Sequence, residues 1–173
     1  MKAVIRGVDA LATWVERVLA GALLIGISLN FINVIGRYVF GYALNGVDEI
    51  EIYILIWIAF LGAAAVTWRG QHLRMDVLIN ACPAPLRFAV WVFETMVFLA
   101  VAGFVAWQSF KYVERIYALG AASDIAHIPT WIAHSAVAVS FGLMVLIVLL
   151  RAAQRLILPG VPPQSIPEGG QTP

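Results

Sequence analysis

Four long apolar segments, separated by shorter polar ones, set the pattern of this sequence. They cover residues 15–35, 52–68, 88–110 and 130–150. A helix needs about 20 apolar residues to cross a bilayer, within a range of about 17–25, and each segment falls in that range. In lipid, a single segment that crosses the membrane must satisfy the hydrogen bonds of its own backbone, and a helix does so. The pattern therefore predicts an all-α membrane protein with four transmembrane helices, in which short loops make neighbouring helices antiparallel.

The connection between the second and third predicted spans, residues 69–87, has a mixed pattern. Apolar residues at 73 and 77–79 alternate with His72, Arg74, Asp76 and Asn80, before Pro83 and Pro85. Such a mixture is typical of a short amphipathic helix lying in the membrane interface, and we expect one here. The segment 159–173 holds five of the eight prolines, so we expect a disordered cytoplasmic tail after a membrane domain of residues 1–158.

The composition supports a membrane location. Of the 173 residues, 62% are hydrophobic and 12% are charged, and the mean hydropathy is +0.89. A soluble domain with this composition would expose most of its apolar surface to water. The single cysteine, Cys82, excludes an intramolecular disulfide and a thiolate metal cluster.

Lysine and arginine are distributed unevenly between the two ends of the predicted spans. One side carries Lys2, Arg6, Arg17, Arg69, Arg74, Arg87, Arg151 and Arg155, and the other carries Arg37, Lys111 and Arg115. Loops rich in these residues stay in the cytoplasm, so both termini are expected there. The first apolar run is too long for the core of a signal peptide and lacks a small-residue cleavage site after it, so we expect an uncleaved span.

A polar stripe runs along the outer half of the first span. It consists of Gly26, Asn30, Asn33 and Arg37, whose spacing places them on one helix face. Amides in a span form interhelical hydrogen bonds worth about 1 kcal/mol each, so we expect this face to contact protein. The acidic residues at the start of the second span, which lie at the same depth, are the expected partners of Arg37: Asp48, Glu49 and Glu51. The alternative is that all these charges are solvated among the headgroups and contribute little.

The second span is graded by residue size. Ala59, Gly62, Ala63 and Val66 share one face, and a bulkier face carries Trp57, Leu61, Ala64 and Trp68. A face of small residues lets two helix backbones approach closely in lipid, so we expect it to pack against another helix. The alternative is a lipid-facing span that happens to be rich in alanine.

Glu94 lies about two turns inside the third span. A charged acid near the centre of a span costs about 2.5–3.5 kcal/mol on insertion scales, so such acids tend to be paired or functional. Three roles stay open for Glu94: pairing within the chain, contact with a partner subunit, or binding of a coupling ion.

The sequence offers no catalytic constellation. It contains no glycine-rich phosphate loop, no HExxH motif and no aligned Ser/His/Asp set, and nothing points to nucleic acid. We therefore expect no enzymatic activity, no metal and no cofactor. Transport sites combine internal repeats with interrupted helices near the midplane, and neither feature is visible here. The chain is better interpreted as a partner of a larger protein.

Several short motifs stand at characteristic places along the four spans. They are Arg37-Tyr38-Val39-Phe40, Asp48-Glu49, Gly62 followed by alanines, His72-x-x-x-Asp76 after Arg69-Gly70, and Ile128-Pro129-Thr130-Trp131. Together they resemble the small membrane subunit of TRAP (tripartite ATP-independent periplasmic) transporters, the DctQ-like family. The resemblance covers roughly residues 14 to 150 and includes the order and orientation of the four spans.

This resemblance implies a scaffold subunit of a sodium-coupled importer of organic acids in a bacterial inner membrane. Its implied partners are a large multi-span subunit, which carries substrate and sodium, and a periplasmic substrate-binding protein. The candidate structural or subunit-interface residues are Asn30, Asn33, Arg37, Asp48, Glu49, Glu51, Gly62, Arg69, His72, Asp76 and Glu94. Two other classes stay open: an autonomous homo-oligomeric transporter or channel that uses Glu94, and a redox membrane anchor.

Overall fold

Four long helices make up the part of the chain that the structure describes. The computed structural model describes residues 2–42, 44–69 and 83–157. Its helices are α1 (Lys2–Val39), α2 (Val47–Arg69), α4 (Ala84–Leu119) and α5 (Trp131–Ile157). Each contains a segment long and apolar enough to cross a membrane. The prediction of an all-α protein with four membrane-spanning helices is confirmed.

The helices are longer than the apolar segments that predicted them. Helix α4 has 36 residues, whereas the predicted third span had about 23. It begins directly after Pro83, and Pro85 lies in its first turn. Proline has no backbone N–H, and none is needed there because the N–H groups of the first turn have no acceptor within the helix. Helix α4 ends at Gly120, whose φ of 62° permits the left-handed conformation that closes a helix. Hydropathy detects only the part of a helix that crosses hydrocarbon, because polar residues continue the helix into the interface.

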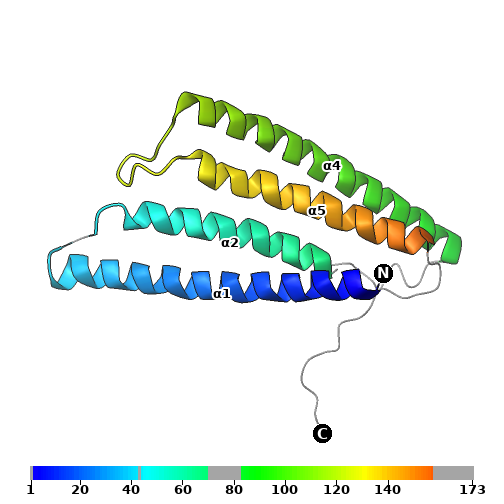
Figure 1. The fold of residues 1–173 in the computed structure, drawn as a ribbon, viewed down its shortest axis with the longest axis horizontal. Coiled ribbons are helices and arrows are strands. Elements are labelled where there is room, and N and C mark those ends of the chain that lie inside the picture. Colours follow the sequence, from blue (N-terminus) through cyan, green and yellow to red (C-terminus); the bar gives the residue numbers. More distant parts are fainter. Residues whose placement is uncertain (1, 43, 70–82, 158–173) are drawn as a thin grey trace, which may run out of the picture.

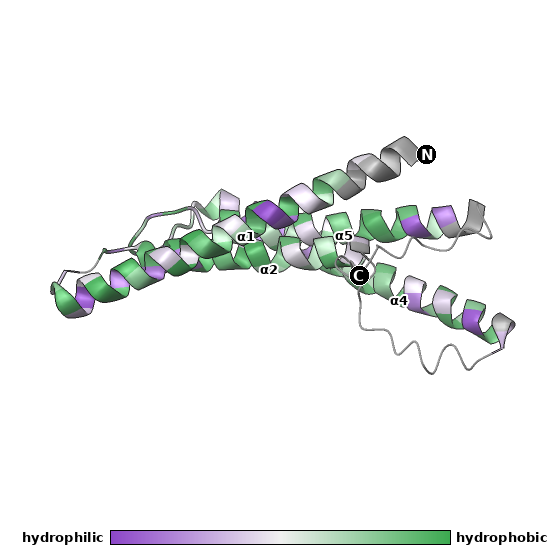
Figure 2. Ribbon diagram, turned by 90° about the horizontal axis from the view of Figure 1, so that it is seen from below, coloured by the Kyte–Doolittle hydropathy of each residue, from purple (hydrophilic) through white to green (hydrophobic). Residues whose placement is uncertain are grey.

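The helices form a single layer in the order α1, α2, α5, α4 (Figure 1). Each neighbouring pair in this order packs together, so α2 and α5 are central and α1 and α4 form the edges. Viewed from below, the helices overlap in the middle of the layer and diverge toward its ends (Figure 2). A layer that is one helix thick has two broad faces and no enclosed interior.

The closest packing in the layer joins α4 and α5. The smallest exposed fractions on α5 occur at Ala133, Ala136, Ser140 and Met144, with Ala136 and Ser140 fully buried, and Ala102 on α4 is also buried. Four of these five side chains are small, and small buried side chains allow helix backbones to approach closely. We call these five residues the α4–α5 seam.

The small-residue face predicted on α2 does not pack within this chain. Ala59, Ala63 and Val66 are exposed, and a Cβ atom added to Gly62 would meet nothing within 4 Å. Helix α2 instead buries Ala64, which belongs to the face predicted to be bulkier, together with other residues on its sides. The expectation that the small-residue face packs against another helix was therefore wrong within this chain, because α1 and α5 take the two flanks of α2.

Two loops close the end of the layer opposite the N-terminus. In the α1–α2 loop, the backbone N–H of Tyr42 donates to the Gly36 carbonyl over 2.9 Å. A Cβ atom at Gly36 would lie 2.7 Å from the Tyr42 carbonyl oxygen, so the turn requires glycine there. In the α4–α5 loop, an isolated bridge pairs Ala122 with Pro129. The predicted amphipathic helix and the predicted tail lie outside the described residues, and the orientation of the termini stays a prediction.

Candidate functional site

A ladder of side-chain hydrogen bonds joins α1 to α2 in the half of the layer near their loop. Asn30 Nδ2 donates to Glu51 Oε2 over 2.8 Å, and Asn33 Nδ2 donates to Asp48 Oδ1 over 2.9 Å. The Asn33 Oδ1 atom accepts the backbone N–H of Leu44 over 3.0 Å, so this side chain also holds the loop. Asn33 is 3% exposed and Glu51 is 8% exposed. Buried amides and carboxylates need such partners, because desolvating an unpaired polar group is costly.

Arg37 extends this ladder at its exposed end. Its Nη2 atom lies 3.2 Å from Asp48 Oδ2, in an ion pair whose side chains are 51% and 62% exposed. The structure thus selects Asp48 among the three acids expected near Arg37, while Glu51 bonds to Asn30 and Glu49 points elsewhere. An ion pair this exposed contributes about 1 kcal/mol or less to stability.

Glu49 fastens the α4–α5 loop to the start of α2. Its Oε2 atom accepts the backbone N–H of Ala126 over 2.6 Å, and Oε1 accepts that of Ile125 over 3.2 Å. One turn further along α2, the Tyr53 hydroxyl donates to the Ile128 carbonyl over 3.3 Å. A carboxylate that accepts backbone N–H groups forms charge-assisted bonds, which are stronger than neutral ones. This outer latch joins residues that are 75 to 77 positions apart in the sequence.

Arg151 forms a second latch, which joins the opposite end of α2 to α5. Its Nη2 atom donates to the Trp68 carbonyl in the last turn of α2, and its guanidinium lies 5.7 Å from the centroid of the Trp68 ring. Carbonyls in the last turn of a helix lack partners within the helix, and a cation there also favours the helix dipole. Glu49 in the first turn complements the dipole at the other end. Helix α2 is therefore held to α5 and its preceding loop at both ends.

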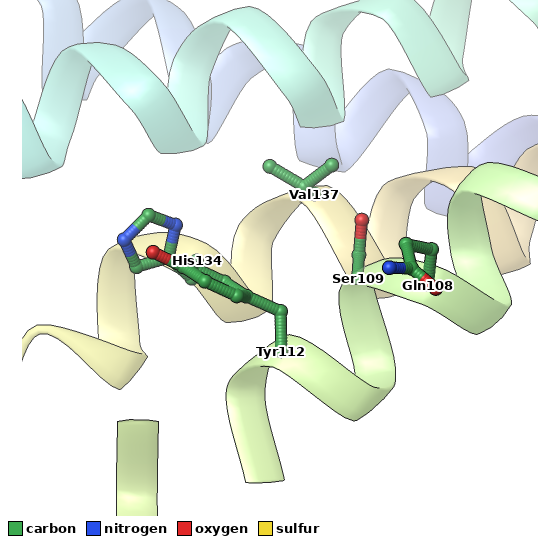
Figure 3. A pocket seen from close by; sticks show the side chains of 5 residues that line it. All are labelled: Gln108, Ser109, Tyr112, His134 and Val137. Carbon is green, nitrogen blue, oxygen red and sulfur yellow. The ribbon is translucent and has the colours of Figure 1, made fainter. Parts of the chain in front are cut away.

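The described residues form at least two open depressions in the surface of the layer. The first is a pocket of about 190 Å³ between α4 and α5, lined by Gln108, Ser109, Tyr112, His134 and Val137 (Figure 3). The second is an open apolar groove of about 440 Å³ between α1, α2 and the start of α5. Its floor includes Trp57 and Leu61 from the face of α2 that lies opposite the exposed small residues.

The remaining candidate residues do not join these clusters. Gly62 lies on the open face of α2, and Glu94 lies on the exposed surface of α4. Arg69 is the last residue of α2, and its side chain, like His72 and Asp76, lies outside the described part of the chain. No group of three metal-ligating side chains occurs among the residues that the structure describes.

Sequence reasoning missed two residues of the latches, Tyr53 and Arg151. In the sequence, Tyr53 resembles any aromatic residue at a membrane interface, and Arg151 resembles any positive charge at the end of a span. The sequence does place Arg151 and Trp68 at the same predicted depth. Trp68 ends the second apolar segment, and Arg151 follows the fourth on the same predicted side of the membrane. Depth alone, however, does not indicate which of several arginines meets the end of α2.

Comparison with known sequences identifies the family of this chain. A sequence profile described as "Tripartite ATP-independent periplasmic transporters, DctQ component" matches residues 26–158. This match covers well over half of the chain and includes the ladder, both latches and the α4–α5 seam. The chain belongs to the DctQ family.

Curated relatives of this DctQ-family chain are TRAP transporter permease proteins. A putative TRAP transporter small permease protein of Haemophilus influenzae is 33% identical over 48% of this chain and 53% of its own length. The ectoine TRAP transporter small permease protein TeaB of Halomonas elongata is 27% identical over 65% of this chain and 59% of its own length. The isethionate TRAP transporter permease protein DctMQ of Oleidesulfovibrio alaskensis is 27% identical over 56% of this chain. The aligned region is 15% of the length of DctMQ. The chain therefore spans no more than about three fifths of the length of any of these three relatives.

Membership of the DctQ family fixes the general class of this protein. It is a multi-pass membrane protein of the TRAP small permease family, whose members are components of transporters rather than enzymes. The family description names the DctQ protein as one component of a tripartite periplasmic transporter.

Proposed function

We propose that this chain is the non-catalytic scaffold subunit of a TRAP-type importer in a bacterial inner membrane. The importer would use a sodium gradient to take up an organic acid, with substrate and sodium bound by a large membrane subunit. A periplasmic binding protein would deliver the substrate, and both termini of this chain would lie in the cytoplasm. On this proposal the chain has no enzymatic activity and needs no cofactor.

The observation that carries this proposal is the single-layer architecture (Figures 1 and 2). A transport pathway needs walls on all sides of the substrate, and a layer one helix thick, about 10 Å across, provides only one wall. The pocket between α4 and α5 and the groove between α1, α2 and α5 are open depressions in its surface rather than enclosed cavities. A second protein must therefore supply the rest of any enclosed pathway.

The contacts within the layer support a static role. Helix α2 is latched to the α5 side through Glu49 and Arg151, and the ladder through Asn33 holds α1 against α2. Polar bonds at several depths along the helices oppose sliding of one helix past its neighbour. Large apolar side chains such as Phe31, Phe93 and Phe104 remain more than 60% exposed, which leaves broad surfaces for lipid or for a partner subunit.

Relatives support the substrate class only in general terms. The names of two relatives specify C4-dicarboxylate transporters, from Rhodobacter capsulatus and Vibrio cholerae, and others specify isethionate and ectoine. Dicarboxylates and isethionate are organic anions, and ectoine also carries a carboxylate. An organic acid is therefore the substrate class that we propose for the importer containing this chain.

The test is affinity purification of the tagged full-length chain from its native membrane in mild detergent, with identification of co-purifying proteins by mass. We expect a large multi-span protein in stoichiometric amount. Purified complex in liposomes should then import an organic acid only when the binding protein and a sodium gradient are present. Uptake by this chain alone, or recovery of the chain only as a homo-oligomer in several detergents, would contradict the scaffold role.

A further inference from the structure

The pocket between α4 and α5 is not used by the contacts described above that hold the layer together. Gln108, Ser109 and Tyr112 come from α4, and His134 comes from α5 (Figure 3). The rings of Tyr112 and His134 meet edge to face with centroids 4.9 Å apart. Among the described residues, no side-chain hydrogen bond accompanies this ring contact at any of the four. Four polar groups thus face one cavity without using their hydrogen-bonding capacity inside the chain.

The pocket lies at the depth of the boundary between hydrocarbon and headgroups. Helix α4 has 36 residues and is about 54 Å long, whereas the hydrocarbon core is about 30 Å thick. About 12 Å therefore extends beyond the core at each end if α4 is centred. Tyr112 lies seven residues, or about 10 Å, before the last residue of α4, and His134 lies about 5 Å into α5. The polar residues that begin at Gln108 mark the same boundary in the sequence.

The charges around the pocket favour an anion. Arg115 follows Tyr112 by three residues, which places it one turn outward on the same side of α4. Lys111 lies about 100° around the helix from Tyr112, outside the pocket lining, with its Nζ atom 3.7 Å from the centroid of the Trp107 ring. Glu114, the nearest acid on the helix, is two residues from Tyr112, which turns it about 200° around α4 and away from the pocket.

We propose that this pocket binds the phosphate of a phospholipid headgroup. The Ser109 and Tyr112 hydroxyls, the Gln108 amide and a His134 ring N–H can all donate hydrogen bonds, and a phosphate diester offers only acceptors. A volume of about 190 Å³ equals the space of about six water molecules, which suits a phosphate and its ester carbons. The lipid would fasten the α4 edge of the layer to the membrane surface.

Nuclear magnetic resonance tests this proposal directly. The full-length chain, labelled with ¹⁵N at histidine, is placed in liposomes of phosphatidylethanolamine and phosphatidylglycerol, and dephasing of the side-chain ¹⁵N signal by lipid ³¹P is recorded. The His134 signal is assigned by its loss in His134→Phe. We expect dephasing at His134, with most of it lost in Ser109→Ala/Tyr112→Phe. The matched control, Ser28→Ala/Tyr38→Phe, removes the same two hydroxyl groups from exposed sites on α1 and should leave the dephasing unchanged.

Two further arms separate the possible occupants. The first uses liposomes of a phosphorus-free glycolipid with inorganic phosphate, and equal dephasing there would overturn the assignment to a lipid. The second uses the chain in complex with its co-purifying large subunit in the phospholipid liposomes. Dephasing that disappears in this complex would show that protein, not lipid, covers the pocket. Absence of dephasing in the first phospholipid sample would also overturn the proposal, and circular dichroism verifies that each variant stays helical.

Discussion

The two halves of the layer are held together by different interactions. Helices α1 and α2 are joined by the amide–carboxylate ladder, in which buried Asn33 bonds to Asp48 and to the loop. Helices α4 and α5 pack extensively and bury the mostly small residues of the seam, of which Ala102, Ala136 and Ser140 have almost no exposed surface. In lipid, where apolar burial gives helices little reason to associate, close packing and interhelical hydrogen bonds are the two main alternatives.

The difference between the halves follows from what each helix pair must achieve. The ladder is directional, because each amide reaches one particular carboxylate, and so it fixes the depth of α1 relative to α2. The seam is non-directional and depends on shape, so it tolerates sliding better but tolerates added volume poorly. The two latches on α2 then join these halves across the centre of the layer. The four predictions below test this division of roles, beginning with the largest expected effect.

Overfilling the seam should be the most damaging change. In Ala136→Leu, three additional carbon atoms enter a position with 0% exposure, and overpacking of this kind costs about 1–3 kcal/mol or more. Chemical unfolding in mixed micelles, followed by circular dichroism, should show this loss. The control Val139→Leu adds one carbon to an exposed site on the same helix and should change stability by less than about 0.5 kcal/mol. Equal stability of the two variants would show that the seam is not closely packed.

Removing the central rung of the ladder should have the next largest effect. Asn33→Ala deletes the bond to Asp48 and leaves the Leu44 N–H without its acceptor, which we expect to cost about 1–2 kcal/mol. The same unfolding assay measures this cost. Asn45→Ala, an exposed amide in the α1–α2 loop, serves as the control. A loss in the control as large as that in Asn33→Ala would refute the ladder as a specific contact.

Weakening the outer latch should act locally. Glu49→Gln replaces a charged acceptor with a neutral one, and we expect the backbone N–H groups of Ile125 and Ala126 to exchange with deuterium about 5–10-fold faster. Hydrogen-exchange mass spectrometry of the α4–α5 loop provides the measurement. Glu114→Gln, an exposed acid on α4, is the matched control. Unchanged protection of the loop in Glu49→Gln would show that other contacts hold it.

Arg37→Ala should have the smallest effect on folding. Its ion pair with Asp48 is more than half exposed, so we expect a loss of less than about 1 kcal/mol. The scaffold role nevertheless predicts that this variant lowers the yield of complex or the rate of transport, while the binding protein keeps its affinity for ligand. Comparison of complex yield with unfolding free energy separates docking from folding. Full yield and full transport in Arg37→Ala and Glu49→Ala would reject a docking role for this end of the layer.

The sequence alone determined the four spans and limited the possible partners within the α1–α2 hairpin. Hydropathy predicted all four spans, because a bilayer imposes length and apolarity on any segment that crosses it. The spacing of Asn30, Asn33 and Arg37 indicated a polar face, and the acids at 48 to 51 had to lie at the same depth because only a short loop separates them. These contacts join residues only 11 to 21 positions apart, so the order of the chain already limits which groups can meet.

Only the tertiary structure decided which faces of the helices pack. The sequence showed two faces on α2, and the structure left exposed the one that seemed better suited to packing, with Ala59, Gly62 and Ala63. It also joined Glu49 to Ala126 and Arg151 to Trp68, which are 77 and 83 positions apart. Such contacts depend on the order of helices in the layer and on the rotation of each about its axis. Neither is set by the periodicity of a single helix, because both result from fitting the side chains of several helices against one another at once.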